Sequence, residues 1–316
     1  MGSLTKFHKL PIIDFTKENI KPNTESWSKV CQQVICALEN YGCFVASYPQ
    51  ISIQLHNSLL HGLEELFLLP TQTKMQNKSD KPLYGYVGQI PFIPLYESMG
   101  IDYANTQPGI QNFTNLMWPK GNIAFSETML SYSKLVAELE ETVVKMVFEG
   151  YGVDEKKYES YLKSINYLSR VMKYREAKAN ENKLGFVSHT DKSFMSTIHQ
   201  FQVDGLEVKA KDGEWFGVEL SPSSVVVMAG DAIMAWSNNR IHSPHHRVIM
   251  GEEGKGDRYS IAQFSFVEGI VETPEEFIDD DHPLQYKPFD HLEFLKFYSK
   301  EENRRLECPI KTYCGV

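Results

Sequence analysis

Three side chains in the second half of the chain have the types and the spacing needed to bind a metal ion. His189 and Asp191 form a His-x-Asp triplet, and the two-residue period of a strand directs both side chains to the same side. His246, fifty-five residues after Asp191, can supply a second imidazole. Two histidines and one carboxylate make the facial set that binds Fe(II) and leaves coordination positions open. The pattern therefore favours an open iron site over a closed zinc site.

A cation and a hydroxyl follow this triplet at a spacing that suits an organic acid. Arg258 and Ser260 share one face if their segment is a strand. A guanidinium can hold a carboxylate through two parallel charge-assisted hydrogen bonds, and the hydroxyl adds a third. The pair predicts an anchor for a dicarboxylic co-substrate whose other end chelates the metal. Two alternatives stay open: a His-x-Asp pair on the surface, and an Arg258 that pairs with Asp257 or Glu252.

The remaining histidines fall into three groups. His242 and His245 crowd beside His246, but Val248 and Met250 continue the face of His246 as an apolar lining. We therefore assign the ligand role to His246 and place the other two in a turn or around the site. His199 follows an apolar strand and is predicted to lie in the core. Five histidines in tails, helices or loops are predicted to be solvated, namely His8, His56, His61, His282 and His291.

The elements that must position these side chains change character near Ser164. Before it, apolar residues at helical spacing predict helices around 27–41, 55–66 and 132–147, with short strands at 11–15 and 43–45. The stretch 72–121 predicts long loops with short strands and a candidate lid. After it, the period of two predicts at least six strands in about 100 residues, a density typical of a sandwich or jelly roll. Asp212 and Gly213 predict a hairpin turn, and strands are expected at 225–228, 246–250 and 259–266. Asp290 and Glu293 predict the start of a final helix.

Composition and missing motifs exclude several classes of function. The 316 residues carry a net charge of −9, and that field would repel the phosphates of nucleic acids. The GxSxG, HExxH, GxGxxG and GxxxxGK[ST] motifs are absent, which weighs against hydrolases and nucleotide-binding enzymes. Five cysteines without a CxxC pair favour free thiols in a reducing compartment. The longest apolar stretch, 225–236, is too short to cross a bilayer. We expect a cytoplasmic protein.

The ordered motifs resemble one known family. The set His189-x-Asp191, His246-Arg247-Val248 and Arg258-x-Ser260 resembles the signature of plant-type Fe(II)- and 2-oxoglutarate-dependent dioxygenases. Segments 11–14, 41–44 and 118–119 match the same family. The runs 185–194, 227–232 and 236–238 are most similar to its AOP-like branch, which is known from glucosinolate side-chain modification.

The resemblance implies roles for individual residues. His189, Asp191 and His246 match the catalytic iron ligands, while Arg258 and Ser260 match the residues that bind the distal carboxylate of 2-oxoglutarate. Tyr174 matches a tyrosine that also contacts this co-substrate, although the family's Asn-Tyr-Tyr-Pro-Pro run is replaced here by residues 172–176, Met-Lys-Tyr-Arg-Glu. The implied fold is α+β, with a distorted double-stranded β-helix (jelly roll) core at 164–270. A helical N-terminal region at 1–163 and a C-terminal helix and tail at 271–316 complete a single catalytic unit, 1–316.

The implied activity is hydroxylation of a small specialised metabolite, steroidal alkaloid-like or glucosinolate-like. Fe(II), 2-oxoglutarate and molecular oxygen would be required, and ascorbate would be supportive. We expect a monomer that binds neither nucleic acid nor membrane. Phe264 and Phe266, on the face of Ser260, and Phe194 are predicted to contact substrate, with weaker candidates Phe92 and Tyr96. Three alternatives remain: desaturation or ring closure by the same chemistry, a non-catalytic jelly-roll protein that binds metal or ligand, and a zinc hydrolase.

Overall fold

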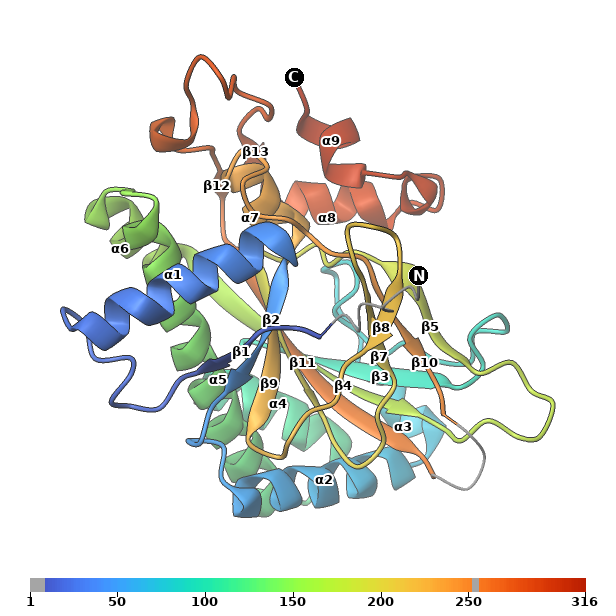
Figure 1. The fold of residues 1–316 in the computed structure, drawn as a ribbon. Helices are drawn as coiled ribbons and strands as arrows, with labels where there is room; N and C mark the ends of the chain where they lie inside the picture. The colour runs from blue at the N-terminus through green and yellow to red at the C-terminus, as the bar shows by residue number, and fades with distance from the viewer. Residues whose placement is uncertain (1–8, 252–255) are drawn as a thin grey trace, which may run out of the picture.

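A computed structural model describes residues 9–251 and 256–316 and contains two main β-sheets (Figure 1). The larger sheet has seven strands in the order β1-β2-β9-β6-β11-β4-β3, and the smaller has four in the order β5-β10-β7-β8. Only the β1–β2 pair of these sheets is parallel. In sheet order, the strands of the larger sheet are β1 (Ile12–Asp14), β2 (Cys43–Ser47), β9 (Ser224–Ala229), β6 (Met195–Gln200), β11 (Arg258–Val267), β4 (Ile165–Tyr174) and β3 (Tyr96–Asp102). Those of the smaller sheet are β5 (Leu184–His189), β10 (His246–Ile249), β7 (Leu206–Lys209) and β8 (Trp215–Gly217).

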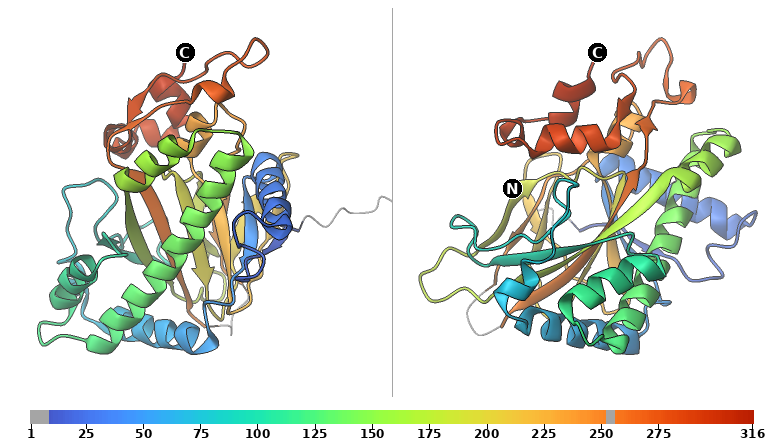
Figure 2. Two further views of the ribbon diagram at one scale, coloured as in Figure 1. Left: turned by 90° about the vertical axis from the view of Figure 1, so that its left-hand side faces the viewer. Right: turned by 180° about the vertical axis from the view of Figure 1, so that it is seen from behind.

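Helices cover one face of the larger sheet, and the long helix α5 runs across it (Figure 2). In α1 and α5, buried residues recur at helical spacing and form a stripe along one side of the helix. This stripe faces the core. A hydrogen bond of 3.0 Å from Gln263 of β11 to the carbonyl of Ser133 joins α5 to the sheet. The helices before the core are α1 (Glu25–Asn40), α2 (Ile53–Leu68), α3 (Thr71–Lys74), α4 (Gln107–Met117), α5 (Ile123–Gly150) and α6 (Glu155–Ser164).

The opposite face of the larger sheet packs on the smaller sheet. One apolar cluster draws residues from both, including Ile198 and Ala262 of the larger sheet and Val208 and Val248 of the smaller. The functional residues therefore lie between two sheets, and the helices support the larger sheet from behind. After β9 come α7 (Asp231–Trp236) and, beyond β11, the short pair β12 (Ile270–Val271) and β13 (Phe289–Asp290), then α8 (His291–Ser299) and α9 (Pro309–Cys314). Short 3-10 turns occupy Glu275–Phe277 and Asn303–Arg305.

The predicted α+β jelly-roll fold is confirmed, as an open seven-stranded sheet with β1 and β3 at its edges among the described residues. The predicted hairpin is confirmed as well, because β7 and β8 pair antiparallel around Gly213, whose φ of +95° suits glycine. The prediction for 72–121 was wrong in one respect. This stretch contains α4, an eleven-residue helix capped by the Thr106 side chain.

Along the described parts of the chain, we find no helix with the length and apolar character needed to cross a membrane.

Candidate active site

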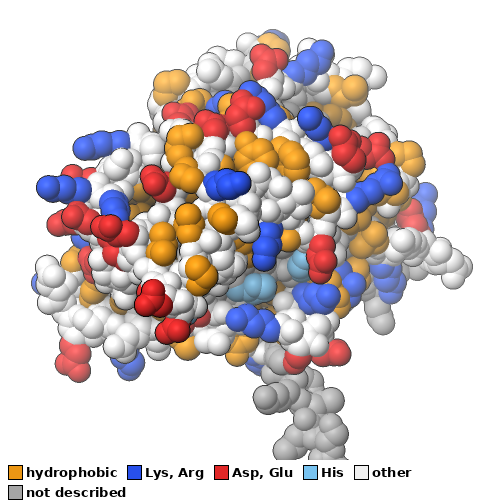
Figure 3. Space-filling model, turned by 90° about the horizontal axis from the view of Figure 1, so that it is seen from above, with side chains coloured by type: hydrophobic (Ala, Val, Ile, Leu, Met, Phe, Trp, Pro, Cys, Tyr) orange, Lys and Arg blue, Asp and Glu red, His pale blue; other side chains and the backbone are white. Residues whose placement is uncertain are grey.

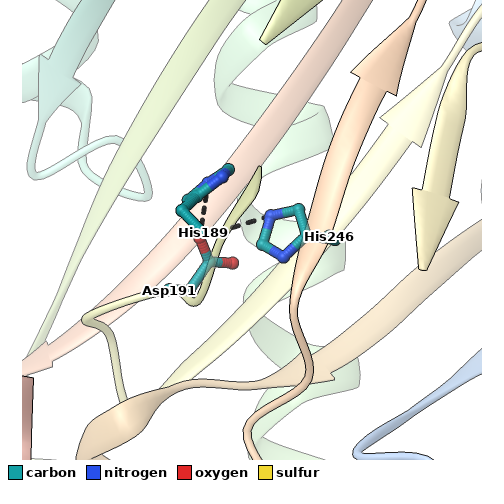
Figure 4. Close-up of side chains that lie close together, drawn as sticks. All are labelled: His189, Asp191 and His246. Atoms are coloured by element: carbon teal, nitrogen blue, oxygen red, sulfur yellow. Dashed lines mark ion pairs between the residues drawn. The ribbon is translucent and has the colours of Figure 1, made fainter. Parts of the chain in front are cut away.

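The His-x-Asp triplet and His246 meet at one point between the sheets. His189 ends β5 and His246 begins β10, and the two residues are direct partners in the antiparallel register. Asp191 lies two residues beyond β5. Its Oδ1 is 3.6 Å from the Nε2 atom of each histidine, and the three side chains point toward one another (Figure 4). One ligand atom from each side chain lies within 4.8 Å of the other two, so the three can share a single metal ion.

Backbone carbonyls orient both imidazoles. Nδ1 of His189 is 2.9 Å from the carbonyl oxygen of Val187, and Nδ1 of His246 is 3.5 Å from that of Pro244. A carbonyl can only accept, so Nδ1 carries a proton, and Nε2 is the nitrogen directed toward Asp191. The buried Oδ2 of Asp191 has no hydrogen-bond partner among the described residues. Two imidazoles directed through Nε2 and a carboxylate oxygen without a hydrogen-bond partner fit a divalent cation such as Fe(II).

The protonation states also suit metal binding. Burial acts to raise the pKa of Asp191, but the neighbouring His246 and His189 hold it well below its usual range. Burial, followed by the charge of His189, lowers the pKa of His246 to about 4. At neutral pH the carboxylate is therefore ionised and the His246 imidazole is neutral, which are the forms that coordinate a metal.

Arg258 is a buried cation that forms no ion pair with the described residues. Its side chain is 1% exposed, and Nη1 donates to Ser260 Oγ at 3.2 Å while Nη2 donates to Gln200 Oε1 at 2.9 Å. Among the described residues, no carboxylate oxygen forms an ion pair with it within 4.0 Å, and its Nε has no hydrogen-bond partner. Asp257, one of the surface partners considered above, forms its ion pair with Lys173, at 2.7 Å; Glu252 lies outside the described residues.

Tyr174 lies opposite Arg258 in the β4–β11 register, and the guanidinium carbon is 4.8 Å from the centre of its ring. The Tyr174 hydroxyl is 3.6 Å from the sulfur of Met172, the residue that departs from the family's asparagine. Sequence reasoning missed Gln200, which reaches Arg258 from β6. No local pattern singles it out, because β6 is buried along its whole length and carries other polar residues, and Gln200 meets Ser260 only through the β6–β11 register.

The metal-binding side chains, Tyr174, Arg258 and Ser260 line one cavity of about 1580 Å³. Phe264 and Phe266 border it, and so do Phe92 and Tyr96; contact of these residues with substrate stays a prediction. The prediction for Phe194 needs correction. Phe194 precedes β6 and is 1% exposed in the core beside the helices, with its ring 4.8 Å from Tyr161 and 5.7 Å from Trp236, and it is not part of the cavity wall.

The cavity opens beside the C-terminal helices. Residues of segment 75–93 and of the stretch 295–309 border it together with the metal-binding side chains. Seen from the end where α8 and α9 lie, histidine side chains reach the surface among Lys and Arg side chains (Figure 3). His189 is about a quarter exposed, at 25% of its side chain, so the site is accessible from outside.

The burial of the other histidines differs in part from the prediction. His242 and His245 stay outside the metal cluster, as expected, and burial lowers the pKa of His242 to about 4. His199 is buried as predicted. The prediction of solvation was wrong for His56, which bonds His199 at 3.0 Å, and for His291, which is fully buried and whose pKa burial lowers to about 4. His8 lies outside the described residues.

Comparisons with known proteins agree with this geometry. Residues 161–266 match the 2OG-Fe(II) oxygenase superfamily, and residues 10–91 match the family described as the N-terminal region of non-haem dioxygenases in morphine synthesis. The chain is 43% identical to the Arabidopsis thaliana protein named "Probable 2-oxoglutarate-dependent dioxygenase AOP1", over 97% of this chain and 96% of that protein. It is 32% identical to the 2-oxoglutarate-dependent dioxygenase AOP3 of the same plant, over 100% and 99% of the two chains.

Solved structures show the same arrangement of elements. The complex of the A. thaliana dioxygenase for auxin oxidation 1 with 2-oxoglutarate has a TM-score of 0.77 at 26% identity, covering 87% of this chain and 100% of the other. The corresponding rice dioxygenase has a TM-score of 0.81 at 24% identity, with 98% and 100% covered, and supports the fold alone. The chain therefore belongs to the 2OG-Fe(II) oxygenase superfamily and is a non-haem iron, 2-oxoglutarate-dependent dioxygenase similar to the AOP proteins.

Proposed function

We propose that this enzyme hydroxylates a small specialised metabolite, with Fe(II) held by His189, Asp191 and His246. Bound iron and 2-oxoglutarate supply the oxidising chemistry, in which oxygen is consumed and the co-substrate leaves as succinate and carbon dioxide. One observation carries the proposal: a buried guanidinium with no carboxylate oxygen of the described residues within 4.0 Å borders the same cavity as the metal-binding set.

The side chains of this protein bind and orient the reactants. Arg258 and Ser260 hold the distal carboxylate of 2-oxoglutarate, and Gln200 keeps the guanidinium directed at it. Tyr174 packs against the same guanidinium and closes that end of the cavity. Phe264 and Phe266 form an apolar wall on the substrate side, which favours a hydrocarbon portion of the substrate and helps to exclude water.

We further propose that residues 1–316 form one catalytic unit that acts as a cytoplasmic monomer on a small molecule, without nucleic acid or membrane partners. The net charge of −9 and the five free cysteines support this proposal. Strands from the N-terminal region, β1 to β3, extend the sheet that carries Arg258, which supports a single unit.

The test is an incubation of purified enzyme with Fe(II), 2-oxoglutarate and a panel of steroidal, phenolic and amino-acid-derived metabolites, begun without oxygen and completed after oxygen is admitted. We expect succinate release that depends on both Fe(II) and one class of substrate, together with a product heavier by one oxygen atom. A product lighter by two hydrogen atoms would replace hydroxylation by desaturation or ring closure. Tight metal and ligand binding without succinate would contradict catalysis, and activity that is independent of oxygen would favour the zinc hydrolase.

A further inference from the structure

A buried histidine outside the metal-binding set contacts the turn at residues 190–192, which carries Asp191 and is called the metal turn below. This histidine belongs to the C-terminal region. His291 is the first residue of α8 and is 0% exposed. Its Nδ1 lies 3.1 Å from the backbone nitrogen of Val267, and its Nε2 lies 2.8 Å from the carbonyl oxygen of Lys192. The backbone N–H can only donate and the carbonyl can only accept. The imidazole is therefore neutral, with Nδ1 as acceptor and Nε2–H as donor.

Both hydrogen bonds of His291 involve residues next in sequence to residues of the site. Lys192 follows Asp191 directly, and Val267 follows Phe266, which borders the cavity. The ring of His291 also packs 5.1 Å from the ring of Phe266. A single side chain thus supports the turn that presents the carboxylate and the strand that carries an aromatic wall residue.

The metal turn has further supports on its other side. The Lys192 ammonium forms a buried ion pair of 2.7 Å with Asp231 of α7, and the backbone N–H of Asp231 donates to the carbonyl of Asp191 at 2.8 Å. The ring of Tyr298, also on α8, lies 4.6 Å from the same ammonium. Helix α7 and helix α8 therefore hold the turn between them, and His291 makes the α8 contact to its backbone.

We propose that His291 is a positioning residue that fixes the Asp191 turn for metal binding through the hydrogen bond to the Lys192 carbonyl. The inference rests on the proposed role of Asp191 as an iron ligand. Without that hydrogen bond the carbonyl is left buried without its partner, so the turn must move to find another donor. Groups that orient a metal ligand typically change metal affinity by about 10- to 100-fold when they are removed.

Two polar substitutions separate the two contacts. The amide of His291→Gln reaches about as far as Nε2 and keeps the donor for Lys192. The shorter amide of His291→Asn corresponds to Nδ1 and keeps only the acceptor for Val267. We expect His291→Asn to weaken Co(II) binding about 10-fold, and His291→Gln to remain within about twofold of the unaltered protein, since its hydrogen bond is kept. Co(II) titration followed by visible absorption, without 2-oxoglutarate, measures this independently of turnover.

A matched control is His56→Asn, which alters another buried histidine that bonds His199 on the helix-covered side of the larger sheet. The amide keeps the Nδ1 position but loses the ring contacts with His199 and Phe201, so this variant should lower thermal stability and leave Co(II) affinity unchanged. Equal Co(II) affinities for His291→Asn and His291→Gln, or an equal loss in His56→Asn, would overturn the role of His291. An Asp191→Ala protein that binds Co(II) as tightly as the unaltered chain would instead contradict the metal site itself, so the two failures can be told apart.

Discussion

At the scale of single residues, the site is governed by charges that folding leaves without full compensation. Arg258 is buried, donates hydrogen bonds to the neutral oxygens of Ser260 and Gln200, and has no carboxylate oxygen within the 4.0 Å of an ion pair in the described structure. One oxygen of Asp191 has no hydrogen-bond partner there. A buried charge costs several kcal/mol unless a partner offsets it. Ligands of opposite charge, a dicarboxylate for Arg258 and a metal cation for Asp191, supply that partner.

We predict that Arg258→Gln raises the KM for 2-oxoglutarate about 100-fold, because loss of one member of a buried charge pair costs about 2 to 5 kcal/mol. Turnover at saturating co-substrate should fall much less, since the metal ligands are untouched. Succinate formation as a function of 2-oxoglutarate concentration measures both quantities. Lys173→Gln, on the neighbouring strand with its charge on Asp257, is the control and should leave this KM within about twofold. An unchanged KM in Arg258→Gln would refute the anchoring role.

We predict that Asp191→Ala abolishes Fe(II)-dependent turnover while the fold is retained. Asp191 supplies the one carboxylate of the metal-binding set, and it lies in a turn outside the strands, so its removal should leave the sheets intact. Circular dichroism should match the unaltered protein, and Fe(II) should no longer raise the thermal midpoint. A midpoint that still rises with Fe(II) would show that another group binds the metal.

The residues that sequence reasoning found are those whose chemistry is tied to a strand period. Arg258 and Ser260 share a face of β11 at a spacing of two, as expected. Asp191 instead lies beyond the end of β5, and the turn that follows His189 brings its carboxylate to the same cavity. The prediction that Phe194 contacts substrate was wrong because this residue precedes β6 and its ring faces the helices. Gln200 could not be singled out, since its role depends on the pairing of β6 with β11, which no local pattern specifies.

At the scale of elements, the segment 77–87 forms a cavity wall that is attached to the larger sheet by polar contacts. Arg170 of β4 donates to the carbonyl of Gly85 at 2.9 Å, to Ser98 Oγ at 2.7 Å and also to the carbonyl of Leu83. The Asn77 side chain exchanges two hydrogen bonds with the backbone of Gly100. The wall is therefore held at two places along its length.

We predict that Arg170→Met raises the KM for the organic substrate about 10-fold, because the partly buried hydrogen bonds to the carbonyls of Leu83 and Gly85, at about 1 kcal/mol each, are lost from the wall. The KM for 2-oxoglutarate should change less than about twofold, since the Arg258 contacts remain, while succinate formed without substrate should increase as water enters. Lys81→Met removes a partly exposed ion pair of the same segment with Asp102 and should have little effect. Equal changes in both KM values would contradict a role confined to the wall.

Elements were predictable where periodicity was long and uninterrupted, as in α1, α2 and α5. Helix α4 was missed although Thr106, Pro108 and the buried Ile110, Phe113 and Met117 carry its signals. Glycines and prolines around it favoured a loop locally, and packing of α4 against α5 and β3 overrode that preference.

At the scale of the whole molecule, the protein has three layers, with the larger sheet in the middle. Helices cover one face of this sheet, and the smaller sheet and the cavity lie on the other. The change from helical spacing to a two-residue period near Ser164 predicted helices beside a β-rich core, but the order of the strands depends on contacts between distant segments. The helix layer also contains a buried acid that sequence patterns did not reveal. Glu140 of α5 is 0% exposed, and burial raises its pKa to about 8, although the nearby Ser265 hydroxyl favours the charged form.

Glu140 should make the free energy of unfolding depend on pH. Below its ordinary pKa of 4.5 both the folded and the unfolded states carry the proton, whereas between 4.5 and about 8 only the folded state keeps it. Stability from this group therefore falls as pH rises through that window, by up to about 1.4 kcal/mol per pH unit, and the loss is complete above the folded pKa.

We predict that Glu140→Gln lacks this dependence and gains stability relative to the unaltered protein from pH 5.5 to 7.5. Urea unfolding at several pH values measures the difference, with Glu138→Gln on the exposed side of α5 as the control. Parallel pH profiles for Glu140→Gln and the unaltered chain would show that the buried carboxyl titrates normally.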